Sequence, residues 1–258
     1  DACELAGQDC NTNKTLDRCE PAAGDCNTNV TRDVCELTGN DCNTNGSLDT
    51  TFNSDGKVST SIGSYGAAQA VAIQPDGKLV VAGFASNGSN VDIALARYNP
   101  DGALDTGFGS LGKLVNAGSL GDDYPSALAV QGDGKILVAG SMFNGSKQES
   151  VLLRFSADGI PDAAFGSGGK VVSEVGDIFA ILPEGKILVA GTYSISSTDS
   201  VMALLRLNAD GSPDSSFGSG GKVLTTLSNT NVAALSVEPD NRIVVAGYGD
   251  DATSDYVR

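Results

Sequence analysis

The stretch "PDGKLVVAG" at residues 75–83 decides the fold, because it recurs three times along the chain with little change. The other copies are "GDGKILVAG" at 132–140, "PEGKILVAG" at 183–191 and "PDNRIVVAG" at 239–247. Each copy joins a turn to a short, apolar run rich in β-branched residues, a pattern typical of a β-hairpin. Copies spaced at about fifty residues indicate a repeat architecture.

A second marker follows each of the first three copies. It reads "RYNPDGALDTGFG" from Arg97, "RFSADGIPDAAFG" from Arg154 and "RLNADGSPDSSFG" from Arg206. We interpret the Asp-Gly pair as a turn that joins one repeat to the next, with the arginine paired to a turn aspartate. A phenylalanine recurs once per repeat, and we expect these residues to be packing anchors between repeats: Phe52, Phe108, Phe165 and Phe217.

The repeat itself divides into short β-strands. In the second copy these are "GKLVNA", "SALAVQ", "KILVAG" and "SVLLRF", and no stretch shows a sustained helical period. Four strands in about fifty residues is the size of a β-propeller blade. A β-solenoid would use a shorter period. We therefore predict an all-β chain whose residues 50–258 form a propeller of four-stranded repeats. Four repeats are present, so the ring closes with four, belongs to a larger ring, or is completed by a neighbouring copy.

Residues 1–49 contain a different repeat, of sixteen residues: "DCNTNKTLDRCE" from Asp9, "DCNTNVTRDVCE" from Asp25 and "DCNTNGSLDT" from Asp41. All six cysteines lie here, which favours disulfides and an oxidising compartment over zinc, since there is no CxxC pair and no histidine. Pairing the cysteines that lie seven apart uses all six: Cys3–Cys10, Cys19–Cys26 and Cys35–Cys42. Because "DACE" at Asp1 matches the middle of this repeat, we expect a piece of a longer precursor.

Oxygen side chains recur in this repeat at positions 1, 3, 5, 9 and 12, which is the spacing of a Ca²⁺ loop. The candidate ligands are Asp9, Asn11, Asn13, Asp17 and Glu20 in the first copy, Asp25, Asn27, Asn29, Asp33 and Glu36 in the second, and Asp41, Asn43, Asn45 and Asp49 in the third. Position 6, which favours glycine, holds Lys14 and Val30 in the first two copies. The alternative is that Asp and Asn only cap turns. Five sequons are possible glycosylation sites: Asn13, Asn29, Asn45, Asn87 and Asn144.

The unit "LDTTF…GK…PDGKLVVAG…ALARYNPDG" resembles the delta-sixty repeat of large bacterial secreted proteins, from Gly46 to Arg258. Residues 1–49 resemble the "DxNxNGxxDxCE" Ca²⁺ repeats of bacterial secreted proteins and, more loosely, thrombospondin type-three repeats and dockerin loops. These resemblances imply a propeller on an extracellular or cell-surface protein, preceded by a calcium-binding stalk. They imply no reaction and no catalytic residue.

The composition narrows the function further. The net charge is −16, which disfavours nucleic acid and anionic membranes as partners. No apolar run is long enough to span a membrane. A nucleophile triad is excluded by the lack of histidine and of cysteine after residue 42. Five acids lie outside the repeated motifs and have no supporting motif: Asp122, Asp123, Glu149, Glu174 and Asp177.

The sequence thus predicts a non-catalytic, secreted structural or adhesive protein that binds Ca²⁺ and self-associates. A stalk docked onto the next propeller would make a filament. The alternative is a lectin-like propeller that binds carbohydrate or protein, and an enzyme ranks third.

Overall fold

The computed structural model describes residues 48–116, 121–196, 199–228, 230–251 and 254–255. Residues 1–47, which hold nearly all of the predicted stalk, lie outside this set, so the predicted boundary between residues 49 and 50 stays a prediction. The chain divides into two compact units. One comprises the residues up to Ser59 together with Pro100–Ala103, and the other comprises Thr60–Asn99 together with the residues from Leu104 onward.

The larger unit consists of antiparallel sheets formed by strands that follow one another in the chain. The first sheet contains β1 (Gly66–Ile73), β2 (Leu79–Ser86), β3 (Val91–Tyr98) and β4 (Lys113–Asn116). The second contains β5 (Tyr124–Val130), β6 (Ile136–Phe143), β7 (Gln148–Phe155) and β8 (Lys170–Ser173). The third contains β9 (Ile178–Ile181), β10 (Ile187–Ser194), β11 (Ser200–Leu207) and β12 (Lys222–Ser228). The fourth has three strands, β13 (Thr230–Val237), β14 (Ile243–Asp251) and β15 (Ser254–Asp255).

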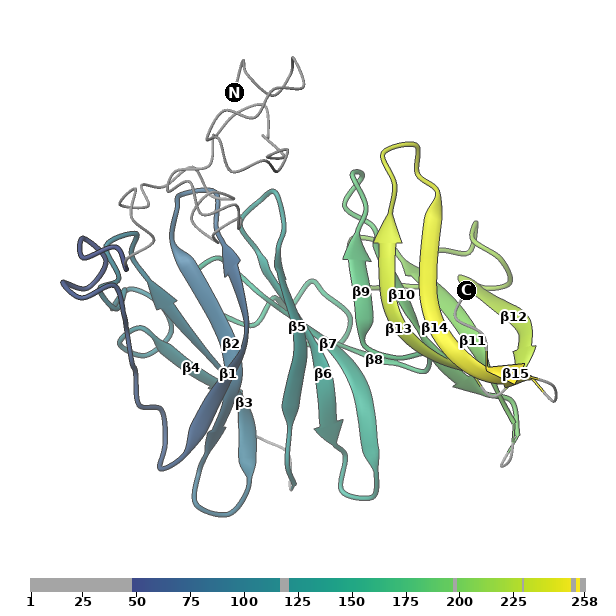
Figure 1. The fold of residues 1–258 in the computed structure, drawn as a ribbon, viewed down its shortest axis with the longest axis horizontal. Helices are drawn as coiled ribbons and strands as arrows, with labels where there is room; N and C mark the ends of the chain where they lie inside the picture. The colour runs from purple at the N-terminus through teal and green to yellow at the C-terminus, as the bar shows by residue number, and fades with distance from the viewer. Residues whose placement is uncertain (1–47, 117–120, 197–198, 229, 252–253, 256–258) are drawn as a thin grey trace, which may run out of the picture. The chain divides into compact units, whose positions relative to one another are not determined.

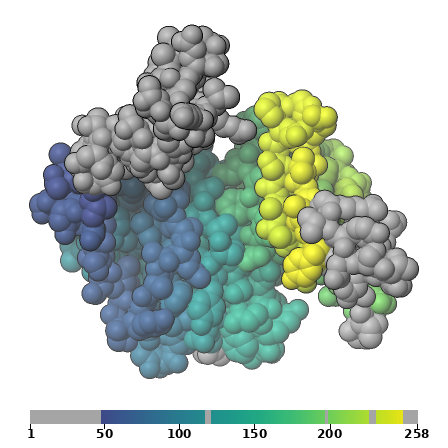
Figure 2. Space-filling model, in the orientation of Figure 1, coloured from purple at the N-terminus to yellow at the C-terminus, as the bar shows by residue number. Residues whose placement is uncertain are grey.

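The described residues contain no helix, which confirms the all-β prediction. Figure 1 shows the four sheets following one another in chain order. The space-filling view of Figure 2 shows the same order from blue to yellow. Each sheet is therefore one repeat of the sequence, built from local hairpins.

The first sequence marker forms the hairpin at the start of each sheet. In the first sheet, the turn between β1 and β2 is closed by a hydrogen bond from the Gln74 N–H to the Lys78 carbonyl oxygen, at 2.8 Å. Gly77 has a φ of 83°, a conformation that glycine adopts without a steric penalty. The apolar run that follows alternates between the two faces of the sheet, as a strand requires.

The structure groups the strands differently from the order suggested by the sequence. Lys113–Asn116 of "GKLVNA", which was expected as the first strand of the second repeat, form β4, the last strand of the first sheet. The reason is the Asp-Gly segment after β3, which folds back on itself. The Arg97 N–H donates to the Gly112 carbonyl oxygen at 3.1 Å, so the chain returns alongside β3 before it leaves for the next sheet.

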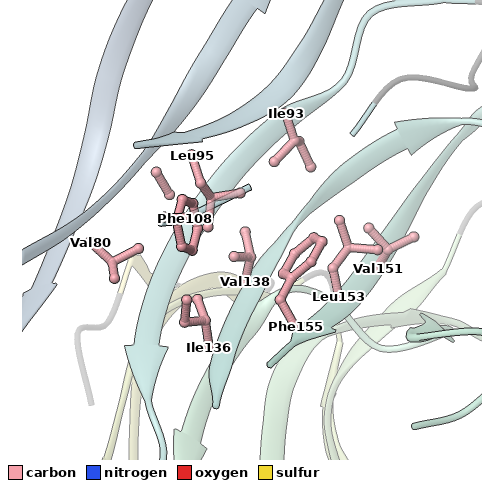
Figure 3. Close-up of a cluster of buried hydrophobic side chains, with 10 residues drawn as sticks. Val80, Ile93, Leu95, Phe108, Ile136, Val138, Val151, Leu153 and Phe155 are labelled. Atoms are coloured by element: carbon pink, nitrogen blue, oxygen red, sulfur yellow. The ribbon is translucent and has the colours of Figure 1, made fainter. Parts of the chain in front are cut away.

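The core of the larger unit lies between consecutive sheets. Figure 3 shows the cluster between the first and second sheets, which come together through side chains from both. Its members are Val80, Ala82, Ile93, Leu95 and Phe108 from the first repeat, and Ile136, Val138, Val151, Leu153 and Phe155 from the second. A second cluster joins the second and third sheets in the same way, around Leu137, Phe165 and Ile187. Apolar burial between neighbouring repeats therefore stabilises the stack.

In the smaller unit, Asn53 donates its backbone N–H to the Asp101 carbonyl oxygen at 2.7 Å. The Gly56 N–H bonds the Phe52 carbonyl oxygen at 2.8 Å and closes a turn. Lys57–Ser59, which match the start of β4 in sequence, form no strand here.

Candidate functional site

An ion cluster recurs once in each of the first three repeats, and we call it the Arg-Asp-Lys cluster. Its members come from three places in each repeat: the lysine of the first marker, the arginine one residue before the end of the third strand, and the aspartate of the following turn. The copies are Lys78, Arg97 and Asp105; Lys135, Arg154 and Asp162; and Lys186, Arg206 and Asp214.

Backbone hydrogen bonds position the aspartate in addition to its ion pairs. In the first copy the Asp105 N–H donates to the Arg97 carbonyl oxygen at 2.9 Å, and Asp105 Oδ1 accepts from the Gly107 N–H at 3.1 Å. The other carboxylate oxygen then accepts from Arg97 Nε at 2.8 Å and lies 3.0 Å from Lys78 Nζ. One carboxylate thus neutralises two cations, one from the turn before β2 and one from β3.

Burial makes these contacts strong. The arginine side chain is only 4% exposed in the first copy and 5% in the second, whereas the lysine partners are 29% and 36% exposed. Each arginine also lies over the phenylalanine of its own turn. The guanidinium carbon is 5.0, 4.4 and 4.5 Å from the ring centroids of Phe108, Phe165 and Phe217. A desolvated cation over an aromatic ring is favourable, so the ring and the carboxylate share the arginine.

The aspartates stay ionised because of these partners. The hydrogen bond from Lys78 lowers the pKa of Asp105, with further help from the Gly107 N–H and the Arg97 charge. Burial raises the pKa of Asp162, but the Ala164 N–H and the two cations of its cluster outweigh this effect, so the net shift is downward. The hydrogen bonds from Lys186 and Ser216 hold the pKa of Asp214 far below the usual range of an aspartate.

The arginines of the first two copies also join one repeat to the next. Arg97 Nη1 donates to the Ala157 carbonyl oxygen, and Nη2 lies 3.2 Å from Asp158 Oδ1, both in the Asp-Gly turn of the second repeat. Arg154 repeats the contact with the carbonyl oxygen of Ala209 in the third repeat. The cluster is therefore an inter-repeat clamp. This outcome confirms the predicted pairing of the repeated arginine with a turn aspartate.

The predicted phenylalanine anchors are confirmed where the clamp is complete. Phe108 and Phe165 are fully buried. A Cβ added at Gly159 would lie 2.8 Å from the Phe108 ring, and one added at Gly211 would lie 2.9 Å from the Phe165 ring. Each phenylalanine therefore packs against the glycine of the next repeat's turn.

Most of the predicted metal, disulfide and glycosylation residues lie outside the described residues. These are the six cysteines, the metal ligands from Asp9 to Asn45, and the sequons at Asn13, Asn29 and Asn45. The remaining metal ligand, Asp49, accepts from the Thr51 N–H at 2.8 Å and from the Thr51 hydroxyl at 2.7 Å. Within the described ranges, no group of three or more His, Cys, Asp or Glu side chains is placed to hold a metal ion.

The other two sequons occupy exposed hairpin tips. Asn87 lies between β2 and β3, and Asn144 lies between β6 and β7. Their side chains already close the turns: Asn87 Nδ2 donates to Asp92 Oδ2 at 2.8 Å, and Asn144 Nδ2 donates to Glu149 Oε1 at 2.6 Å. Their surface position is compatible with modification, but attachment of a glycan would remove one of these donors.

The acids outside the repeated motifs are spread over several structural contacts. Asp122 Oδ1 accepts from the Val91 N–H at 3.0 Å, and buried Asp123 accepts from the Phe143 N–H at 3.0 Å. Glu174 lies 2.7 Å from Lys222 Nζ, and this bond lowers the pKa of Glu174. The structure therefore gives Asp122 and Asp123 hydrogen bonds to backbone N–H groups and gives Glu174 an ion pair.

The sequence did not reveal every member of the cluster. The recurring lysine was visible in the first marker, but its pairing with an aspartate some 27 residues later depends on how β2 and β3 lie together. Buried Asp92, which accepts from Asn87, was also not predicted, although Glu149 accepts from Asn144 at the same position of the second repeat.

Comparison with known families agrees with this architecture. Residues 74–108, 131–165 and 182–217 match a family model described as a domain of unknown function (DUF5122), beta-propeller. Each matched segment contains one complete Arg-Asp-Lys cluster with its phenylalanine. No curated protein matches the chain. In the described part of the chain, no helix has the length and apolar character needed to cross a membrane. These three segments are therefore similar to a β-propeller repeat family.

Proposed function

We propose that the chain is a non-catalytic, extracellular structural or adhesive surface protein whose copies join into a polymer. The observation that carries this proposal is the repeated clamp. Its arginine is almost fully buried in each of the first two repeats, where it helps to lock one sheet onto the next. Buried contacts that hold neighbouring sheets together suit a protein that bears mechanical load rather than one that turns over a substrate.

The N-terminal repeats would add stability outside the cell. Their acidic and amide side chains have the spacing of Ca²⁺ ligands, and their cysteines suit an oxidising compartment. Bound Ca²⁺ would also offset part of the charge of −16, which otherwise repels neighbouring copies.

Light scattering of the purified 258-residue chain tests the polymer. We expect a mass above that of the monomer, rising with protein concentration and with added Ca²⁺. A strictly monomeric chain in millimolar Ca²⁺ and 0.15 M salt would refute self-association. Mapping of disulfides by mass spectrometry checks the stalk independently, with the pair Cys3–Cys10 as the first bond expected.

A lectin-like binding module is the second candidate, and one observation favours it. Tyr65, Phe84 and Tyr124 form an aromatic row, with ring centroids 5.8 and 5.2 Å apart. Tyr65 is 64% exposed and Tyr124 is 37% exposed, so two rings are open for stacking on a sugar. A glycan array would support this candidate if binding were lost in Tyr65→Ala. An array without hits would count against it.

A further inference from the structure

Two sheet faces of the larger unit are more exposed than their counterparts in the other repeats. We call Val71, Ile73, Leu79 and Val81 the leading face; they lie on β1 and β2, on the side of the first sheet away from the second. We call Val244, Ala246 and Tyr248 the trailing face; they lie on β14, on the side of the fourth sheet away from the third. Strand register sets both groups, since side chains two apart share a face.

The trailing face differs in exposure from the same positions elsewhere. Val244 corresponds to Val80, Leu137 and Leu188, all of which are fully buried. Val244 is 47% exposed and Tyr248 is 62% exposed. The sequence is as apolar as in the other repeats, so the exposure arises because no sheet among the described residues covers this side, and not from a change of side chain.

The leading face is also more exposed than the corresponding face of the next two repeats. Val71 is 62% exposed and Ile73 is 48% exposed. In the next two repeats the corresponding residues pack against the inter-sheet cores: Leu128 in the second repeat, and Phe179 and Ile181 in the third. The first sheet therefore presents a face that the second and third sheets use for packing.

The internal junctions show what fits these faces. Between the first and second sheets, Val80 and Ala82 on the trailing side pack with Ile136 and Val138 on the leading side. At the edge of this junction, Phe84 meets Tyr124 edge-on at 5.2 Å. Tyr248 takes the place of Phe84 in the fourth sheet. A trailing face is thus matched in shape and chemistry by a leading face. Each copy exposes one trailing face and one leading face.

We propose that the trailing face of one copy packs against the leading face of a second copy, repeating the internal junction between two molecules. This proposal rests on the self-association in the proposed function and names the surfaces that carry it. Two different faces in contact make a heterologous interface, which continues into a ring or a filament. Docking through the N-terminal stalk is the competing route.

Two double variants separate these routes. Val71→Asp with Ile73→Asp blocks the leading face, and Val244→Asp with Tyr248→Asp blocks the trailing face. Ile160→Asp with Val172→Asp is the matched control, because these residues are 65% and 46% exposed but lie outside both faces. Circular dichroism checks that each variant retains its sheet content.

Analytical ultracentrifugation in 0.15 M salt with Ca²⁺ provides the measurement. Each blocked variant alone should sediment as a monomer, whereas the control should assemble like the unmodified chain. An equimolar mixture of the two blocked variants should form dimers and nothing larger, because it contains one intact face of each kind. These dimers would also show that both variants are folded.

Other outcomes overturn the proposal. If the blocked variants assemble like the control, the faces are wrong while self-association stands, and the stalk becomes the expected contact. If one blocked variant dimerises alone, or the mixture stays monomeric, the interface is not heterologous. If the unmodified chain is monomeric under the same conditions, both this inference and the polymer fail.

Discussion

Replacement of Arg154 by methionine tests whether the clamp stabilises the repeats. Arg154 lies at the centre of the second Arg-Asp-Lys cluster, 2.9 Å from Asp162 and 4.4 Å from the Phe165 ring centroid. It also donates to the Ala209 carbonyl oxygen of the next repeat. Methionine keeps most of the apolar stem and removes only the charge and the donors, so the change isolates the polar contacts.

The expected loss follows from these contacts. A hydrogen bond that involves a charged group contributes about 1.5–3 kcal/mol, and a desolvated cation–π contact contributes about 1–2 kcal/mol. Asp162 keeps Lys135 as a partner, and methionine packs against the ring, so part of the loss is recovered. We expect the free energy of unfolding to fall by about 3 kcal/mol.

Lys135→Met is the matched control in the same cluster. Its side chain is 36% exposed and its ammonium lies 3.4 Å from Asp162, so water screens the pair. Exposed ion pairs contribute about 0–1 kcal/mol, and we expect a loss in that range. Urea unfolding followed by circular dichroism measures both variants. An Arg154→Met loss no larger than that of Lys135→Met would refute the clamp.

Three further predictions concern packing, acid and calcium. Gly211→Ala should cost at least 1 kcal/mol more than Gly185→Ala in urea unfolding, because both have φ near +80° but only the Gly211 Cβ would collide with Phe165; equal losses would contradict this. The free energy of unfolding should stay constant down to about pH 4 and fall at lower pH, because the cluster aspartates have lowered folded-state pKa values and their stabilisation is lost on protonation. Asp214→Asn should reduce the fall of the urea midpoint with decreasing pH. An unchanged dependence of the urea midpoint on pH would contradict the role of Asp214. Calorimetric titration should detect Ca²⁺ binding that weakens in Asp9→Asn with Asp25→Asn, and the absence of binding heat in the unmodified chain would favour the turn interpretation.

Much of the fold was predictable because its information is local. The "PDGKLVVAG" copies fix a turn by glycine and aspartate and a strand by alternating apolar residues, so the hairpins follow from neighbours in the chain. The grouping of strands was less accessible. β4 joins the first sheet because the Arg97 N–H donates a hydrogen bond to the Gly112 carbonyl oxygen. These two residues are fifteen apart, and no local sequence pattern predicts their pairing.

The candidate site shows the same division. The pairing of Arg97 with a turn aspartate was expected, since both recur at a constant separation. The sequence did not predict that Lys78 shares the same aspartate, or that Arg97 donates a hydrogen bond to the Ala157 carbonyl oxygen of the next repeat. Both depend on the arrangement of strands and sheets in space. The calcium, disulfide and localisation hypotheses rest on residues 1–49 and stay predictions.

By itself, the sequence determined the repeat, the all-β class and the anchors Phe108 and Phe165, because these depend on period, turn chemistry and alternation. Only the tertiary structure decided which cations share a carboxylate and which apolar faces are covered. Val80 and Val244 occupy the same place in nearly the same sequence, yet one is fully buried and the other is 47% exposed. The difference is the presence of a neighbouring sheet, since burial belongs to the assembly of repeats and not to the strand that carries the side chain.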